Sequence, residues 1–246
     1  MSSTRFPGKV LAQILGEPMV LRQIERIRRA AFIDELVVAT STHASDDLLV
    51  ETLEAAGVAV VRGDLDDVLG RFIAVLDRAW AGDEQPDAVV RLTGDCPLAS
   101  PRVIDQVIAH FRETGADYAS NTMLPTFPDG LDVEVVRASV LREVADETTD
   151  PDEREHVTLG VYRRHDRYRV ENLADATNHA DLRWTVDTPE DFAFVSAVYD
   201  ALYPGNPEFE YADVLALLAE HPELSRTEHD AARNAALIGL DTGAMQ

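Results

Sequence analysis

The fold class of this 246-residue chain is decided by an alternation that begins with ELVVAT at residues 35–40. This apolar, β-branched run is typical of a buried strand. It is followed by SDDLLVETLEAAG (45–57), in which Ser45 is expected to cap a helix and Gly57 to end it. The run VAVV (58–61) then predicts a second strand. Strand, helix and strand at this spacing imply parallel pairing across a crossover helix.

The same alternation extends through the first half of the chain. Apolar residues at helical spacing predict helices, and short apolar runs predict strands. The expected elements are helices over 18–31, 66–80 and 101–114, the last capped by Ser100, and a strand over 87–92. We therefore expect a Rossmann-like open α/β sheet, in which ligands bind at the carboxyl ends of the strands.

The second half is expected to add shorter elements, with mixed or antiparallel strands. The expected strands are 117–120, 131–136, 168–173 and 182–186, and the expected helices are 138–147, 153–164, 189–202, 211–220 and 231–240. The run PGNP (204–207) is the clearest linker. It divides an α/β domain over 1–203 from a helical extension over 204–246, which we expect to pack on the same domain.

Composition excludes several classes of protein. The chain has 45 acidic residues against 22 Lys and Arg, a formal net charge of −23. Such a field repels polyanions, so we expect no nucleic-acid partner and no membrane partner. The single cysteine, Cys96, allows no internal disulfide and is expected to be a buried residue rather than a nucleophile. With no apolar run of about 18 residues and no signal-peptide pattern, a cytoplasmic protein is expected.

The N-terminal segment SSTRFPGK (2–9) combines hydroxyls, a guanidinium, a Pro-Gly turn and an ammonium. Lys9 is the only lysine in the chain, whose other fixed positive side chains are all arginine. A lysine carries a compact charge on a long stem, which suits a phosphate reached through a narrow loop. The segment is therefore a candidate phosphate-binding loop. The alternative is a disordered polar tail, which is common at chain ends.

Hydroxyl and acidic side chains follow several of the expected strands. Thr40 and Ser41 end the first strand, Asp95 lies in the turn TGDCP, and Asp187 follows the run RWTV. Two carboxylates at strand ends can hold one Mg²⁺, with substrate phosphates completing its coordination. The alternatives are an Asx-turn for Asp95 and a turn residue before a helix for Asp187.

Seven motifs in order carry a resemblance to a known family. They are STRFPGK (3–9), VVATS (37–41), RG (62–63) with DVLGR (67–71), RLTGDCP (91–97), PDGLDVE (128–134), REHVT (154–158) and RWTVDTPED (183–191). With them the chain resembles the cytidylyltransferases that include CMP-Kdo and acylneuraminate (CMP-sialic acid) synthetases. It is most similar to the branch called spore coat polysaccharide biosynthesis protein F. The last ~45 residues match less distinctly.

This resemblance implies a nucleotide-diphospho-sugar transferase fold, with a mixed, mostly parallel sheet flanked by helices. It also implies that a hydroxyl of an acidic sugar attacks the α-phosphate of CTP, giving a CMP-sugar and pyrophosphate. The expected cofactor is Mg²⁺. The expected partners are CTP and a small sugar, with a homodimer left open. Such a transfer needs in-line positioning and neutralisation of phosphate charge more than covalent help.

In this interpretation the phosphates lie against the N-terminal loop. Arg5 and Lys9 are expected to face them as the catalytic residues. Ser3, Thr4 and Gly8 are expected to bind the nucleotide, through hydroxyls and backbone N–H groups.

The metal and the nucleoside have candidates further along the chain. Asp95 and Asp187 are expected to hold Mg²⁺ against the phosphates. Thr40 and Ser41 are expected to contact the base or the ribose. Arg71 is a further nucleotide-binding candidate, and an ion pair with the aspartate one helical turn before it is the alternative.

The sugar is expected to bind at PDGLDVE and REHVT. The candidates are Asp129, Asp132, Glu134 and His156. Strand alternation puts Asp132 and Glu134 on one face, where two acids could bind sugar hydroxyls. The alternatives are a solvated face of an edge strand for the two acids and a structural role for the histidine.

One departure from the family pattern affects the expected sheet. Family members have an apolar strand before the phosphate loop, whereas this sequence begins inside the loop. We therefore expect the first family strand to be missing from the sheet. The two hypotheses are that the true chain starts upstream and that a truncated protein folds or binds nucleotide weakly.

Two other functions stay open beside cytidylyl transfer. The same fold also serves glycosyltransferases that use sugar nucleotides, since fold does not determine function. A non-catalytic nucleotide-binding protein is the third possibility, because of the missing strand.

Overall fold

The structure is a computed structural model that describes residues 5–79 and 85–227. Ser3 and Thr4, two of the expected nucleotide-binding residues, lie outside the described residues, as does the helix expected over 231–240. In the described part, no helix has both the length and the apolar character needed to cross a membrane.

The first β–α–β unit forms as the alternation predicts. Strand β3 (Val37–Ser41) pairs in parallel with β4 (Ala59–Gly63), and helix α2 (Asp47–Ala55) crosses between them. Asp46, not Ser45, precedes the first residue of α2, because residues 44–46 form a separate 3-10 turn. Gly57 follows this helix at φ 67°, which suits glycine.

A second, mixed sheet has the strand order β5-β7-β6-β8. Its strands are β5 (Ala88–Arg91), β6 (Tyr118–Ser120), β7 (Glu134–Arg137) and β8 (Val170–Asn172). Strand β7 runs antiparallel to both β5 and β6, whereas β8 is parallel to β6. Within this sheet β7 alone therefore runs against the others, which confirms the mixed, mostly parallel sheet.

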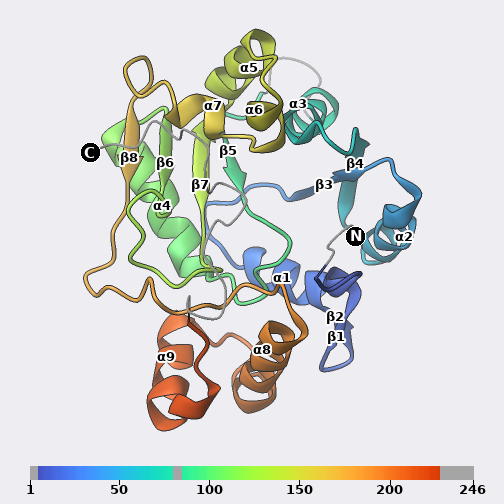
Figure 1. The fold of residues 1–246 in the computed structure, drawn as a ribbon, viewed down its shortest axis with the longest axis vertical. Coiled ribbons are helices and arrows are strands. Elements are labelled where there is room, and N and C mark those ends of the chain that lie inside the picture. Colours follow the sequence, from blue (N-terminus) through green and yellow to red (C-terminus); the bar gives the residue numbers. More distant parts are fainter. Residues whose placement is uncertain (1–4, 80–84, 228–246) are drawn as a thin grey trace.

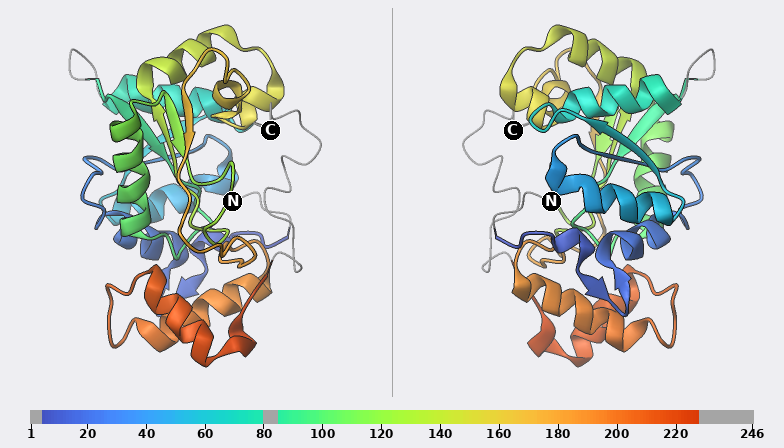
Figure 2. Two further views of the ribbon diagram at one scale, coloured as in Figure 1. Left: turned by 90° about the vertical axis from the view of Figure 1, so that its left-hand side faces the viewer. Right: turned by 90° about the vertical axis from the view of Figure 1, so that its right-hand side faces the viewer.

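Helices cover both sides of the sheets (Figures 1 and 2). Helix α4 (Pro101–Thr114) packs on β6 and β7 and also contacts α1 (Met19–Ile27). Helices α3 (Val68–Ala79) and α5 (Ala138–Glu147) pack together on the opposite side, α3 against β3 and β4 and α5 against β5 and β7. Because successive side chains of a strand point to opposite faces, one strand packs against the helices on both sides of its sheet.

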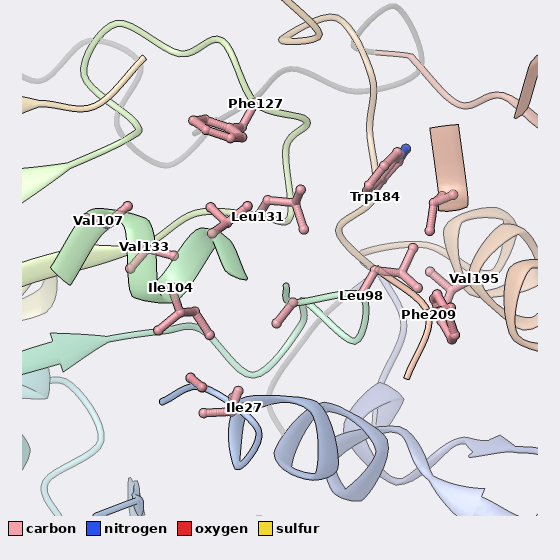
Figure 3. Close-up of a cluster of buried hydrophobic side chains, with 14 of the residues drawn as sticks. Ile27, Leu98, Ile104, Val107, Phe127, Leu131, Val133, Trp184, Val195 and Phe209 are labelled. Carbon is pink, nitrogen blue, oxygen red and sulfur yellow. The ribbon is translucent and has the colours of Figure 1, made fainter. Parts of the chain in front are cut away.

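Neighbouring residues of β7 enter different cores. Val135 joins the cluster beneath α4, whereas Val136 joins the cluster beneath α3 and α5. The larger cluster continues to the end of the molecule formed by α8 (Pro189–Leu202) and α9 (Tyr211–Glu220) (Figures 1 and 3). Figure 3 shows Trp184 close to this end, where its buried indole contacts the Tyr211 ring edge to face.

Smaller elements complete the described chain. Strands β1 (Gln13–Ile14) and β2 (Glu17–Pro18) form a hairpin, and three 3-10 turns span Lys9–Leu11, Ala44–Asp46 and Pro222–Leu224. The single helix expected over 153–164 is instead two short helices, α6 (Pro151–Glu155) and α7 (Leu159–Tyr162). The break between them lets the Thr158 hydroxyl reach a carboxylate of the sheet, that of Glu134.

The segment expected as a strand over 182–186 is extended but joins no sheet. It makes only isolated bridges, Asp129↔Arg183 and Leu182↔Thr227, among the described residues. Its backbone bonds go to three separate segments, because Trp184 N donates to Asp129 O, Val186 N to Asp95 O, and Arg183 N to Arg226 O. The segment thus connects distant loops instead of extending a sheet.

Strands β3 and β5 border a gap. In residues 5–79 and 85–227 no strand pairs with the edge of β3 that faces away from β4, or with the edge of β5 that faces away from β7. A cavity of about 460 Å³ lies there, lined by residues of both strands and by apolar side chains that include Ile24 and Leu76. Gln23 also lines it, and its buried Oε1 accepts no hydrogen bond from the described residues.

We expect this gap to be visible in hydrogen exchange. Among the described residues, the edges of β3 and β5 that border the cavity have no strand partner, so amides of these two strands should exchange faster than those of β7, which is paired on both sides. Hydrogen–deuterium exchange with peptide-level mass spectrometry measures this difference. Equal protection of β3, β5 and β7 would contradict the open gap.

Candidate active site

Lys9 stands at the centre of a cluster of charged residues. Its backbone follows Gly8, which has φ 73°, and opens the first 3-10 turn. The Nζ atom donates to Asp95 Oδ2 at 3.1 Å, to Asp187 Oδ1 at 3.0 Å and to the Val186 carbonyl at 2.6 Å. Burial alone would lower the pKa of Lys9, but the charges of the two aspartates outweigh burial and raise it.

Arg5 extends the same cluster toward solvent. Its guanidinium lies 3.3 Å from Asp187 Oδ1, and its side chain is 52% exposed, against 12% for that of Lys9. Burial alone would raise the pKa of Asp187, but the positive charges around it, Lys9 first, hold it below its usual value. Arg5 therefore has the freedom to contact a ligand, whereas Lys9 is held between carboxylates.

Backbone hydrogen bonds bring the two aspartates together. Val186 N donates to Asp95 O at 2.8 Å, and Thr185 Oγ1 donates to the same carbonyl at 3.3 Å. The turn after β5 and the segment before α8 are thus joined directly. Two carboxylates 92 positions apart in the sequence, residues 95 and 187, converge on one cation.

Arg183 organises the acidic side of the cluster. Its guanidinium is buried and donates to Asp129 Oδ2 at 3.0 Å, to Asp187 Oδ2 at 2.7 Å and to Asp191 at 3.3 and 3.4 Å. Asp191 also accepts from the backbone N–H groups of Asp187 and Thr188, both at 3.0 Å, and closes the capping box of α8. This network holds Asp187 in its position.

The PDG turn is fitted tightly against the same segment. Gly130 has φ 106°, and a Cβ atom there would lie 2.6 Å from Thr185 N. Only glycine adopts this positive φ easily and also leaves room for the Thr185 backbone. The buried Asp129 carboxylate next to it pairs with Arg183 and so helps to hold the site together, and its expected contact with sugar stays a prediction.

Glu134 is likewise held by partners inside the protein. Its carboxylate is buried in β7 and accepts from Tyr118 Oη at 2.7 Å and from Thr158 Oγ1 and Arg91. Burial alone would raise the pKa of Glu134, but the Arg91 guanidinium and the hydroxyl donors hold it below its usual value. These internal donors give the carboxylate a structural role in the second sheet, and its expected contact with sugar stays a prediction.

Asp132 and His156 are the remaining sugar-binding candidates. Asp132 is half-buried just before β7, and it lies near Cys96. Burial and then the charges of Asp95 and Asp132 raise the pKa of the buried Cys96 thiol, as expected for a residue that is no nucleophile. His156 is half-buried at the end of α6. A contact of either residue with sugar stays a prediction.

Thr40 and Ser41 bind Asp46, which was not among the predicted site residues. Thr40 Oγ1 and Ser41 Oγ donate to Asp46 Oδ2 at 2.7 and 2.6 Å, and Ser41 N donates to it at 3.1 Å. Burial alone would raise the pKa of Asp46, but these hydrogen bonds hold it far below its usual value. The hydroxyl protons of both candidates are thus committed, and only their oxygen lone pairs remain for a nucleotide.

Arg71 lies across the carboxyl end of β4. Its NH1 donates to the carbonyls of Asp64 at 2.6 Å and Leu65 at 2.8 Å, and its Cγ lies where a Cβ of Gly63 would come to 2.8 Å. The alternative considered for Arg71, a salt bridge with Asp67, is not formed among the described residues. Asp67 instead accepts from the guanidinium of Arg154, whose Nε lies 2.8 Å away.

The two converging aspartates satisfy a simple test for a cation site. Asp95 and Asp187 both reach the Lys9 ammonium, so one cation position lies within hydrogen-bond distance of two carboxylate oxygens. In the described part of the chain, no three His, Cys, Asp or Glu side chains form a metal-binding group. Two carboxylates are nevertheless what Mg²⁺ uses when substrate phosphates supply further ligands.

Comparison with known proteins now places the chain. A family model described as cytidylyltransferase matches residues 1–219. The chain belongs to this family. Its members are nucleotidyltransferases, and so is this protein. Among curated proteins, the spore coat polysaccharide biosynthesis protein SpsF of Bacillus subtilis (strain 168) is 33% identical over 239 residues, which cover 94% of this chain and 95% of that one.

Further relatives of this cytidylyltransferase are also described as cytidylyltransferases. The 3-deoxy-manno-octulosonate cytidylyltransferase of Geobacter sulfurreducens is 38% identical over 117 residues, 47% of this chain and 43% of that one. A solved cytidylyltransferase from Leptospira borgpetersenii superposes with a TM-score of 0.83 at 26% identity, covering 91% of this chain and 92% of that one. The fold is the nucleotide-diphospho-sugar transferase fold, as expected.

Three residues of the site escaped prediction as functional groups: Arg183, Asp191 and Asp46. Arg183 stands four residues before Asp187 and eight before Asp191. Such spacing predicts ion pairs only on a helix, and no helix is predicted for this segment, so the pairing of Arg183 with the two aspartates could not be predicted from the sequence. For Asp46, the adjacent pair Thr40-Ser41 five residues earlier was the available signal. Short polar side chains at strand ends bind nearby carboxylates and backbone in this way.

Removal of the Ser41 hydroxyl should make the protein more sensitive to acid. The depressed pKa of Asp46 stabilises the fold above the usual aspartate value, and this stabilisation is lost as pH falls through the folded value. Ser41→Ala should therefore raise the pH of acid unfolding and cost about 1.5–3 kcal/mol near pH 7. Circular dichroism during acid and urea titration measures both effects.

The matched control is Ser139→Ala, which removes an exposed hydroxyl on α5. Its acid unfolding should match that of the parent protein. Equal acid midpoints for Ser41→Ala and Ser139→Ala would show that the hydrogen bond from the Ser41 hydroxyl to Asp46 carries no net stabilisation.

Proposed function

We propose that this protein is a Mg²⁺-dependent cytidylyltransferase that transfers CMP from CTP to a sugar and releases pyrophosphate. The observation that carries the proposal is the convergence of Arg5 and Lys9 on Asp95 and Asp187 at the carboxyl end of the sheet. Positive side chains and a carboxylate pair at one point are what nucleotidyl transfer requires.

The chain's own residues account for several parts of this reaction. Arg5 is exposed enough to contact a phosphate without leaving the cluster. Asp95 and Asp187 would hold Mg²⁺, which supplies Lewis-acid polarisation of the phosphate oxygens when bound. Arg183 holds Asp187 through its second oxygen and so keeps the first directed at the cation position. Each of these interactions serves positioning and charge neutralisation, the main needs of phosphate transfer.

The state of Thr40 favours a cytosine base. Its hydroxyl proton is bound to Asp46, so its oxygen can accept a hydrogen bond but not donate one to a ligand. Cytosine presents an amino donor where uracil presents a carbonyl acceptor. The solved CMP:2-keto-3-deoxy-manno-octonic acid synthetase described as complexed with CTP shares the fold at a TM-score of 0.56 and 19% identity. It supports the proposal at the level of fold alone.

The acceptor is proposed to be an acidic sugar that is used in a surface polysaccharide. The support is the printed names of the relatives, one a polysaccharide biosynthesis protein and one a cytidylyltransferase of an acidic sugar. Asp132, which lies near Cys96, is the acceptor-side residue we propose. A cytoplasmic location follows from the proposal, because CTP is a cytoplasmic metabolite.

Asp95→Asn should abolish pyrophosphate release. The substitution keeps the size of the side chain but removes one of two carboxylate charges at the cation position, so turnover should fall about a hundredfold or more. A coupled pyrophosphate assay with CTP, Mg²⁺ and a panel of sugar acids measures this. Asp77→Asn, which alters an exposed ion pair with Arg142, is the control and should keep parent activity. Parent-level activity of Asp95→Asn would remove Asp95 from the site.

Among CTP, UTP, GTP and ATP with Mg²⁺, CTP should give the largest increase in melting temperature, because bound ligand stabilises the folded state. A thermal-shift panel measures this. A larger shift with UTP would contradict the assignment to Thr40. Release of UDP or GDP from a sugar nucleotide would identify a glycosyltransferase instead. CTP binding without pyrophosphate release in any sugar panel would identify a non-catalytic nucleotide-binding protein.

A further inference from the structure

The Lys9 ammonium uses all its donors inside the site. Its three N–H groups are matched by three oxygens, those of Asp95, Asp187 and Val186, at 3.1, 3.0 and 2.6 Å. In this arrangement the only lysine of the chain has no donor left for a phosphate. The expected contact of Lys9 with the phosphates therefore requires the ammonium to leave at least one of these oxygens.

The same ammonium stands at the point where the carboxylates converge. Asp95 Oδ2 and Asp187 Oδ1 both face it, and the other oxygen of Asp187 is held by Arg183. A divalent cation that used both facing oxygens would meet the Lys9 charge at the same place. Two cations there would repel each other strongly, since the site is only partly exposed to water.

We propose that Lys9 is a displaceable cation that couples the binding of metal to the binding of nucleotide. The inference rests on the proposed function, which places a divalent cation between Asp95 and Asp187. Without nucleotide, Lys9 neutralises the two carboxylates and opposes metal binding. With nucleotide, a phosphate accepts the ammonium, and the carboxylates become free for the metal.

The backbone around Lys9 allows such a movement of the side chain alone. Lys9 N donates to Phe6 O at 3.3 Å, and Ala12 N donates to Lys9 O at 3.0 Å, so turns on both sides fix the Cα atom. The four-carbon stem is flexible, and its charged end can swing while the backbone stays in place. Arg5, on the same short loop, already reaches Asp187 from the solvent side. A phosphate bound beside this loop lies within reach of the released ammonium.

Thermodynamic linkage makes the coupling measurable. If nucleotide strengthens metal binding through Lys9, metal must strengthen nucleotide binding by the same factor. Removal of the ammonium should therefore have two effects of opposite sign. Metal alone should bind more tightly, and the additional tightening caused by nucleotide should shrink.

The test uses Mn²⁺ as the metal probe, with free Mn²⁺ measured by electron paramagnetic resonance in the presence and absence of CTP. The full chain is compared with Lys9→Met, which keeps the apolar stem, and Arg5→Met, which removes a charge from Asp187 without vacating the point between the carboxylates. Lys9→Met should bind Mn²⁺ alone about tenfold or more tightly than the parent, as expected for loss of a competing charge at contact distance. The increase in Mn²⁺ affinity should be clearly smaller in Arg5→Met than in Lys9→Met. The factor by which CTP tightens Mn²⁺ binding should be smaller in Lys9→Met than in the parent.

Asp95→Asn separates failure of this inference from failure of the proposed function. If Asp95→Asn loses Mn²⁺ binding but Lys9→Met binds Mn²⁺ no more tightly than the parent, the metal site stands and the role of Lys9 is overturned. Equal gains in Lys9→Met and Arg5→Met would also overturn it, because a general field effect would then suffice. If neither the parent nor any variant binds Mn²⁺, with or without CTP, the metal site itself is wrong and both proposals fall.

Loss of the ammonium leaves two carboxylates without their shared partner, so the folding of Lys9→Met needs its own check. Thermal unfolding followed by circular dichroism provides it. Lys9→Gln, whose amide can still donate to Asp95, is the second variant if Lys9→Met does not fold, and the same tightening of Mn²⁺ binding is expected of it.

Discussion

The site depends on one buried guanidinium. Arg183 is almost fully buried, and removal of a charge from water is costly unless partners surround it. Here the partners are three aspartates from three places: the turn before β7, the end of the 182–187 segment and the first turn of α8. The three carboxylates together offset the free energy lost when the Arg183 charge is removed from water. The arginine therefore ties the geometry of the candidate metal ligands to the fold of the second half of the chain.

Much of the fold could be predicted because its signals are local. The parallel unit of β3 and β4, the Ser100 cap of α4 and the Thr188 cap of α8 follow from apolar periodicity and from short polar side chains before helices. The expected strand that joins no sheet is one whose hydrogen-bond partners are distant in the sequence. The 182–187 segment has the composition of a strand, yet its hydrogen bonds go to three separate loops. No local pattern contains that information.

The candidate site was predicted by residue type more successfully than by role. Lys9, Asp95 and Asp187 do meet, as the motifs suggested. Asp129 and Glu134, from the motif assigned to sugar, are buried, the first against Arg183 and the second against Tyr118 and Arg91. A motif is a record of residues that work together, and it does not separate those that touch a substrate from those that hold the others. Burial and hydrogen-bond partners make this distinction, and both depend on the complete fold.

The gap between β3 and β5 has a mechanical consequence. A ladder of backbone hydrogen bonds resists shear, whereas packed side chains allow small sliding at little energetic cost. Across the described residues no such ladder joins the sheet that carries Thr40 to the sheet that precedes Asp95. The base-side and phosphate-side candidates therefore belong to two bodies connected through helices and loops. Packing of side chains around the cavity therefore sets the separation between the Thr40 end of β3 and the turn after β5, and a molecule that filled the cavity would change this separation.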